Sequence, residues 1–246
     1  MVTEDSTEPH LILLPQFDGQ YQVEAVGIAQ GSYQLGILQA ITTTNQVVGG
    51  VLSDTTTLGQ SHRFTVNLSY FQEVGGQVTL EAEHAGWQIE RNQRPWITQT
   101  TLSGYTGPSY LSALPDTDLQ FMTNYTETSP ELQYAINFTT TGTYTVWVRG
   151  YAPNAAGDSL YIALDDQPPQ TLSGFAPRTW SWTAKGSDTP GNLVTLTVTE
   201  PGLHTLRLWQ REDGLRLDRI VITTDSSYNP TGNGPPESER LDSLTE

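Results

Sequence analysis

Two stretches decide the fold of this chain: Val78-Thr-Leu-Glu-Ala-Glu-His84 and Gly214-Leu-Arg-Leu-Asp-Arg-Ile-Val-Ile222. Both have the length and apolar content of β-strands, and acidic side chains interrupt both. Residues two apart in a strand point to the same face, so Glu81 and Glu83 should lie side by side. Such carboxylates repel each other unless a cation lies between or beside them. The first stretch therefore predicts a strand whose acids need a positive partner.

The residues between these stretches also read as short strands. The clearest segments are 132–138, 143–151, 158–165, 193–199 and 203–210, and Gly, Pro, Asn or Asp occurs in every connection. Their close spacing and the absence of a helical period predict a β-sandwich or jelly roll over residues 78–224.

The segments before this region predict a second all-β domain. Alternation with period two recurs in residues 21–27 and 31–38, and turn residues separate the segments. We therefore expect a flexible lead-in at 1–10, a small antiparallel β-sandwich at 11–72 and a linker at 73–77. Residues 225–246 are rich in Pro, Gly and Glu and predict a disordered acidic tail or linker. The predicted fold class is all-β, with two β-sandwich domains of which the second is a jelly roll.

Charge and composition exclude several function classes. The 246 residues carry 27 acids against 11 Lys and Arg, a net charge of −16, and no cysteine. A polyanion repels phosphate backbones, so we expect no nucleic-acid partner, but it favours cations and above all Ca²⁺. Without cysteine, thiol nucleophiles and thiolate metal sites are excluded. No apolar run approaches the ~20 residues of a membrane helix, so we expect no membrane insertion.

The first residues do not resemble a signal peptide, because they lack a basic start and an apolar core. The chain is therefore expected to be cytosolic or cut from a longer secreted precursor. Its acidic, nearly lysine-free β composition favours a bacterial extracellular protein, secreted or on the cell surface.

A third stretch, Arg178-Thr-Trp-Ser-Trp-Thr183, places two tryptophans on one strand face. Together with the Glu-Ala-Glu opening strand and the Leu-Asp-x-Ile closing strand, it resembles carbohydrate-binding modules of the family 6 and 35 type. Residues 76–224 are also similar to the jelly-roll C-terminal domains of family 115 glycoside hydrolases. Residues 10–72, with Gly-Gln-Tyr-Gln-Val and Gly-Ser-Tyr-Gln-Leu, resemble a pre-peptidase C-terminal-like domain.

The resemblance implies a structural calcium ion that joins the first and last strands of the jelly roll. Its carboxylate ligands would be Glu81, Glu83 and Asp218, and backbone carbonyls would complete the 6–8 oxygens that Ca²⁺ prefers. The alternative is that these acids pair with Arg216, Arg219 or solvent.

The resemblance also implies a sugar cleft at one end of the sandwich, where aromatic rings stack on pyranose faces. The candidate carbohydrate-binding residues are Trp96, Tyr105, Trp180, Trp182, Arg211 and Asp213. The family pattern often has an asparagine two residues before the closing acid, and Arg216 stands there in this chain.

Two functions remain open. The first is a non-catalytic accessory module that binds a polysaccharide or cell-surface glycan. The second is a structural or adhesive subunit, fibre-like or surface-layer-like, that binds copies of itself and donates a strand such as Leu11–Leu14. No catalytic motif occurs, and any sugar cleavage would have to use the loop acids Glu212 and Asp213.

Overall fold

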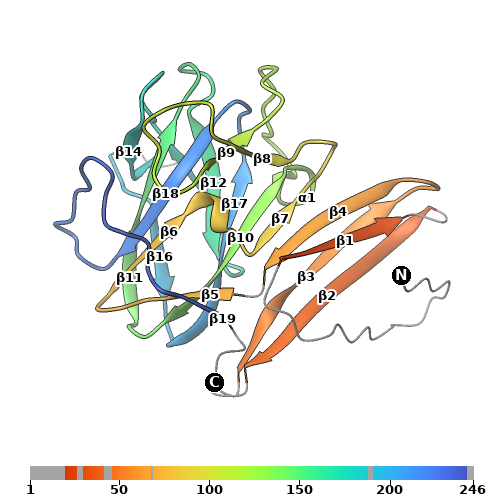
Figure 1. The fold of residues 1–246 in the computed structure, drawn as a ribbon, viewed down its shortest axis with the longest axis horizontal. Coiled ribbons are helices and arrows are strands. Elements are labelled where there is room, and N and C mark those ends of the chain that lie inside the picture. The colour runs from red at the N-terminus through yellow and green to blue at the C-terminus, as the bar shows by residue number, and fades with distance from the viewer. Residues whose placement is uncertain (1–19, 27–29, 42–45, 68, 188–190, 243–246) are drawn as a thin grey trace.

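A computed structural model describes residues 20–26, 30–41, 46–67, 69–187 and 191–242. The regular structure of its described part is nearly all β, with two large sheets that form a sandwich and a separate two-stranded sheet (Figure 1). The helices are single turns, η1 (Ala82–His84) and α1 (Tyr125–Thr128). No helix among the described residues is long and apolar enough to cross a membrane. The prediction of an all-β fold with a jelly roll is confirmed.

The first sheet has the order β1-β4-β7-β10-β17-β12-β13-β15. These strands are β1 (Gln20–Val26), β4 (Ser61–Asn67), β7 (Trp87–Ile89), β10 (Glu131–Phe138), β17 (Gly202–Gln210), β12 (Ser159–Leu164), β13 (Gln170–Ser173) and β15 (Lys185–Gly186). Two short strands, β5 (Ser69–Gln72) and β19 (Arg240–Asp242), join beside β10, where β5 is parallel to β10.

The second sheet has the order β14-β11-β18-β9-β8 and is antiparallel. Its strands are β14 (Ser181–Thr183), β11 (Gly142–Tyr151), β18 (Arg216–Thr223), β9 (Tyr110–Ala113) and β8 (Trp96–Gln99), with β6 (Gln77–Glu81) beside β18 and β16 (Thr195–Val198) beside β11. The opening strand β6 and the closing strand β18 are therefore direct neighbours.

The core lies between the two sheets and follows the period-two pattern of the strands. In β10, Leu132, Tyr134 and Ile136 point inward, and in β11 Val146 and Val148 do the same. All five are fully buried. Because alternate residues face the core, the intervening residues of β11 are left to build the outer face of the second sheet.

The sequence predicted a separate small β-sandwich at residues 11–72, but the described N-terminal strands do not form one. Strands β1 and β4 extend the first sheet of the jelly roll, because β4 pairs with β7. Strands β2 (Gly31–Ile41) and β3 (Gln46–Thr56) form a two-stranded hairpin beside them (Figure 1). The predicted linker 73–77 does not separate two domains, because β4 before it and β7 after it are hydrogen-bonded to each other. The predicted lead-in and the strand Leu11–Leu14 lie outside the described residues.

Residues 73–77, predicted as a linker, form a turn that is fixed to the sandwich. The Glu73 side chain is 1% exposed. It accepts hydrogen bonds from the backbone amides of Gly76, Thr139 and Thr140 and from the Thr139 hydroxyl. Burial opposes ionisation of Glu73, but these donors together lower its pKa. The buried carboxylate thus joins this turn to the β10–β11 connection.

The C-terminal segment 226–242, predicted as disordered, instead packs along the sandwich (Figure 1, dark blue). Thr79 of β6 exchanges two hydrogen bonds of 2.9 Å with Ser238, and β19 pairs with β5. The prediction of a disordered tail or linker is wrong for this segment because backbone and polar groups hold it, together with the contact of Leu241 with Tyr70. Below we call residues 226–242 the C-terminal strap.

Candidate functional site

Aromatic rings from distant parts of the chain meet on the second sheet. The ring of Tyr110, which is buried, lies 5.3 Å from that of Tyr105 and 5.4 Å from that of Trp180. Trp180 also meets Tyr151 edge-on, with 5.6 Å between the ring centroids. Tyr105, Tyr151 and Trp180 are each partly exposed. The structure thus brings together two of the predicted binding residues, Tyr105 and Trp180, through Tyr110.

Arginine side chains flank these rings. The Arg216 guanidinium lies 5.3 Å from the centre of the Tyr151 ring, and the Arg149 guanidinium lies 5.5 Å from that of Trp180. Arg216 donates to the carbonyl of Gly214 at 2.8 Å. Among the described residues no carboxylate lies within ion-pair distance of Arg216. We call the group Tyr105, Tyr110, Tyr151, Trp180 and Arg216 the aromatic site.

The loop that carries Tyr105 is anchored at several points. The indole NH of Trp180 donates to the carbonyl of Ser103 at 3.0 Å, and Arg149 donates to that of Gly104 at 3.0 Å. The amide of Thr106 donates to Asp218 at 2.6 Å. Because residues on both sides of Tyr105 are bound to the sandwich, the position of its ring is fixed by the body of the protein.

The three acids of the calcium prediction lie beneath this loop. Glu81 and Arg219 are cross-strand partners on β6 and β18 and form a buried ion pair. Asp218 forms a second buried ion pair with Arg149 of β11. The Thr106 hydroxyl bridges the pairs, at 2.9 Å from Glu81 and 3.1 Å from Asp218. Burial raises the pKa of Asp218, although Thr106 and Arg149 act against this shift.

Glu83 is the third acid, and it differs from the other two. Its Oε1 accepts from the amide of Ser109 at 3.0 Å, whereas its buried Oε2 has no hydrogen-bond partner. Burial raises the pKa of Glu83 to about 7, and the neighbouring charge of Glu81 contributes to the shift. The backbone of Gly107 (φ +63°) lies against both glutamates, since a Cβ there would be 2.9 Å from Glu83 Oε1 and 3.1 Å from Glu81 Cδ.

This arrangement does not fit the calcium ion that the resemblance implies. Ca²⁺ takes 6–8 oxygen ligands. Both oxygens of Glu81, both of Asp218 and one of Glu83 already accept from protein donors. Arg149 and Arg219 would have to leave before an ion could use them. Among the residues that the structure describes, no group of three or more acidic or histidine side chains is arranged to hold a metal.

Two other predicted aromatic residues, Trp96 and Trp182, lie outside the aromatic site. Trp96 is 5% exposed and belongs to the core between the sheets. Trp182 donates to the carbonyl of Gly232, and a Cβ on Gly234 would lie 2.6 Å from its ring. The C-terminal strap therefore packs against Trp182, which remains partly exposed. The sequence placed Trp182 in a strand but not Trp96, which lies in β8, and it could not show what packs against either ring.

Arg211 and Asp213, the predicted polar residues, serve the loop structure. Arg211 Nη1 contacts Glu212 at 2.5 Å and donates to Ser159 at 2.7 Å. Asp213 is 3% exposed and accepts from Arg94 at 2.9 Å and from the amide and hydroxyl of Thr117 at 2.8 Å each. Burial opposes its ionisation, but these donors lower the pKa of Asp213.

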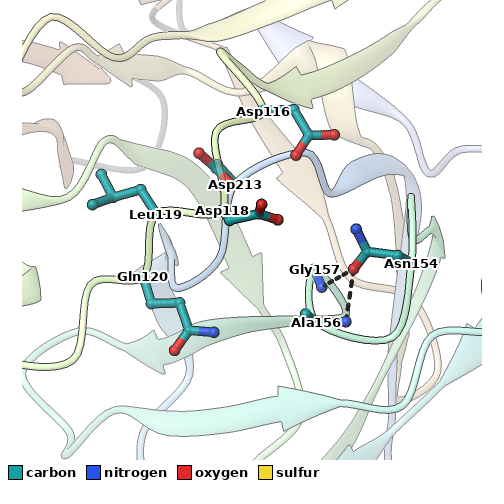
Figure 2. A pocket seen from close by; sticks show the side chains of 8 residues that line it. All are labelled: Asp116, Asp118, Leu119, Gln120, Asn154, Ala156, Gly157 and Asp213. Atoms are coloured by element: carbon teal, nitrogen blue, oxygen red, sulfur yellow. Dashed lines mark hydrogen bonds between the residues drawn. The ribbon is translucent and has the colours of Figure 1, made fainter.

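A small acidic pocket lies at the loops that contain Asp213 (Figure 2). Asp116, Asp118 and Asp213 line it on one side and Asn154 on the other. The side-chain oxygen Oδ1 of Asn154 accepts from the backbone amides of Ala156 and Gly157 at 2.7 and 3.0 Å, as the dashed lines show. The Asn154 side chain thus shapes its own loop, whereas Asp213 connects its loop to the segments that contain Arg94 and Thr117.

Comparison with known proteins identifies the family. The model of the glycosyl hydrolase family 115 C-terminal domain matches residues 70–237. The chain belongs to this family. The match begins at residue 70, so the resemblance of residues 10–72 to a pre-peptidase C-terminal-like domain stays a prediction. An uncharacterized protein of Formosa agariphila, P23, is 26% identical over 197 residues, 67% of this chain and 48% of that protein. The chain spans about half the length of this curated relative.

Solved structures with similar folds include carbohydrate-binding modules. The family 35 module from Paenibacillus barcinonensis is 23% identical over 60% of this chain and 99% of that one, with a TM-score of 0.41. A family 6 module of the Cellvibrio mixtus lichenase 5A, solved with cellotriose, is 18% identical over 60% and 96%, with a TM-score of 0.38. A Podospora anserina β-(1,4)-mannanase with a family 35 module is 21% identical over 64% and 29%, with a TM-score of 0.43.

Sequence reasoning missed three residues that the structure places here. Arg149 and Tyr151 lie in a predicted strand, 143–151, whereas Tyr110 lies in the short strand β9, which was not predicted. Their partners come from other segments of the chain. One signal was available: Tyr151 follows Arg149 by two residues, so both lie on one face of β11. That this face meets Trp180 depends on the tertiary fold.

Proposed function

We propose that this chain is a non-catalytic carbohydrate-binding module of a larger secreted or surface protein, and that the aromatic site binds the sugar. The observation that carries the proposal is the fixed, partly exposed set of Tyr105, Tyr151 and Trp180 beside Arg216. Flat rings held in place can stack on a pyranose without losing side-chain entropy. Membership in a family of hydrolase C-terminal domains supports an accessory role.

Arg216 supplies the polar component of this proposed site. A guanidinium presents several N–H donors in one plane, which suits sugar hydroxyls and, better still, a carboxylate or sulfate. In a chain of net charge −16, Arg216 has no carboxylate within ion-pair distance in the part of the chain that the structure describes, which leaves it able to bind such an anion. The proposed ligand preference is therefore for glycans with acidic groups.

The hydrogen bonds of the loop acids Glu212 and Asp213 support a binding function rather than sugar cleavage. Glu212 accepts from the amide of Asp158 at 2.9 Å and from the Ser159 hydroxyl at 2.7 Å, in addition to its contact with Arg211. Asp213 is likewise occupied by Arg94 and Thr117. Two carboxylates engaged in this way are poorly suited to act as the acid and base of glycoside hydrolysis.

The test is titration calorimetry of the full chain with neutral, uronate-bearing and sulfated oligosaccharides. Stacking of about 1–3 kcal/mol per ring predicts that Trp180→Ala weakens binding by roughly 5- to 150-fold. Arg216→Gln should weaken binding of acidic glycans more than of neutral ones. Tyr125→Ala is the matched control, since Tyr125 stacks on Tyr161 in the other sheet. Equal affinity of the wild type and Trp180→Ala for every ligand bound, or hydrolysis of the ligand, would refute the proposal.

A further inference from the structure

The three-carboxylate cluster has two cationic partners that come from different strands. Arg219 of β18 pairs with Glu81, and Arg149 of β11 pairs with Asp218. The side chains of Arg219 and Arg149 are 9% and 7% exposed, and those of their partners Glu81 and Asp218 are 4% and 0% exposed. Buried charges are stable only when paired and hydrogen-bonded. Together the two guanidinium groups balance two of the three acids, and the third, Glu83, has a raised pKa.

The same guanidinium groups also bind backbone carbonyls, which is a role that metal ions often fill. Arg219 Nη1 donates to the carbonyls of Asn233 and Pro235 at 2.8 and 2.6 Å. Arg149 donates to the carbonyl of Gly232 in the strap at 3.2 Å and to that of Gly104 in the Tyr105 loop at 3.0 Å. Each arginine therefore links a carboxylate to segments that are far away in the sequence.

We propose that Arg149 and Arg219 take the place of the calcium ion that the family 6 and 35 resemblance implies. They close the carboxylate cluster, tie the C-terminal strap to the sandwich, and hold the Tyr105 loop without a metal. A divalent ion could enter only by displacing both guanidinium groups from Glu81 and Asp218. The fold and the loop position are consequently independent of calcium. This inference does not depend on the nature of the ligand at the aromatic site.

Thermal unfolding of the full chain in excess EDTA and in CaCl2 tests the proposal. The useful quantity is the difference in Tm between the two conditions, compared between the wild type and Glu83→Gln. Glu83 offers the one free carboxylate oxygen of the cluster, so its substitution would remove a calcium ligand. We expect the same difference in both proteins, because any calcium bound elsewhere on the acidic surface affects both alike. A larger difference in the wild type would overturn the proposal.

A second pair of variants tests the arginines directly. Arg149→Gln/Arg219→Gln should lower Tm in EDTA, and CaCl2 should now raise it, because one carboxylate oxygen each of Glu81 and Asp218 is released. If the double variant does not fold, the single variant Arg219→Gln serves the same comparison. Arg178→Gln is the control, since Arg178 is exposed and outside the cluster. An arginine variant whose Tm in EDTA equals that of the wild type would overturn the proposal.

Hydrogen exchange gives a readout of the loop itself. The amides of Thr106 and Ser109 donate to Asp218 and Glu83. In the wild type their protection should be the same in EDTA and in CaCl2. Protection that appears only with CaCl2 would show that the metal, and not the arginines, orders the loop.

Discussion

Arg219 and Glu81 stand directly opposite each other on β18 and β6 and form a buried ion pair. This pair joins the closing strand of the jelly roll to its opening strand. The carbonyls of the C-terminal strap satisfy Arg219 Nη1 on the side away from Glu81. The pair is thus the point at which strap, sheet and loop are held together.

Breaking this pair should be costly. Arg219→Gln leaves the Glu81 carboxylate buried without its cation, and we expect a loss of about 3–5 kcal/mol in the free energy of unfolding. Glu81→Gln should cost a similar amount, while the double variant should cost less than the sum. Urea unfolding at neutral pH measures all three. Arg207→Gln is the control: its side chain is 30% exposed and lies 3.9 Å from Glu131, so its loss should be below about 1 kcal/mol. Strictly additive losses at 81 and 219 would contradict the coupling.

Gly107 should resist substitution because its backbone lies against the glutamates. In Gly107→Ala the Cβ would lie 2.9 Å from Glu83 Oε1. Gly75 has nearly the same φ, +62° against +63°, but no atom within 4 Å of its Cβ position. Both variants therefore bear the same left-handed backbone cost. We expect Gly107→Ala to be less stable than Gly75→Ala by about 1–3 kcal/mol, the usual cost of overpacking. Matching stabilities in chemical denaturation would show that the loop can move away.

The C-terminal strap should contribute to stability. A chain that ends at Thr224 loses the carbonyl partners of Arg219 and the β19–β5 pairing. Hydrogen bonds to a charged group are worth about 1.5–3 kcal/mol each, so the loss should be at least about 3 kcal/mol. A chain that ends at Asp242 is the control, because it retains every strap contact described above. The idea fails if differential scanning calorimetry gives both truncated chains the Tm of the full chain.

Glu73 should make stability depend on pH in the acid range. Burial opposes its ionisation, but Thr139 and the surrounding amides lower its folded pKa below the ordinary value of 4.5. The folded state then binds fewer protons than the unfolded state. The stabilisation is complete above 4.5 and is lost as pH falls through the folded pKa. Glu73→Gln should therefore be destabilised at pH 7, by about 1.5–3 kcal/mol for its charge-assisted hydrogen bonds.

The gap between Glu73→Gln and the wild type should narrow as the pH falls below 4.5, and unfolding curves across that range measure it. Glu200→Gln, at an exposed glutamate, controls for the change in net charge. A constant gap at all pH values would mean that ionisation of Glu73 contributes nothing.

The sequence alone determined the strands and their class. Period-two alternation and the spacing of turn residues indicated β10, β11, β12, β16, β17 and β18 correctly, because burial of one sheet face constrains every second residue. They did not indicate β7, β8 or β9, which are short. The Glu-Ala-Glu and Leu-Asp-x-Ile stretches marked the opening and closing strands that lie together as β6 and β18. Trp180 and Tyr105, two of the aromatic residues proposed from the sequence, both contact the Tyr110 ring in the folded protein.

Tertiary structure decided how these pieces are used. Whether a tryptophan is a core residue, as Trp96 is, or part of a surface site, as Trp180 is, depends on neighbours from other strands. The pairing of Asp218 with a guanidinium depends on Arg149, which is 69 residues away in the sequence. The ordering of the strap depended on carbonyl groups, which are the same in every residue and leave no trace in a sequence. Alternation reports burial, whereas contacts between segments follow from how the sheets pack.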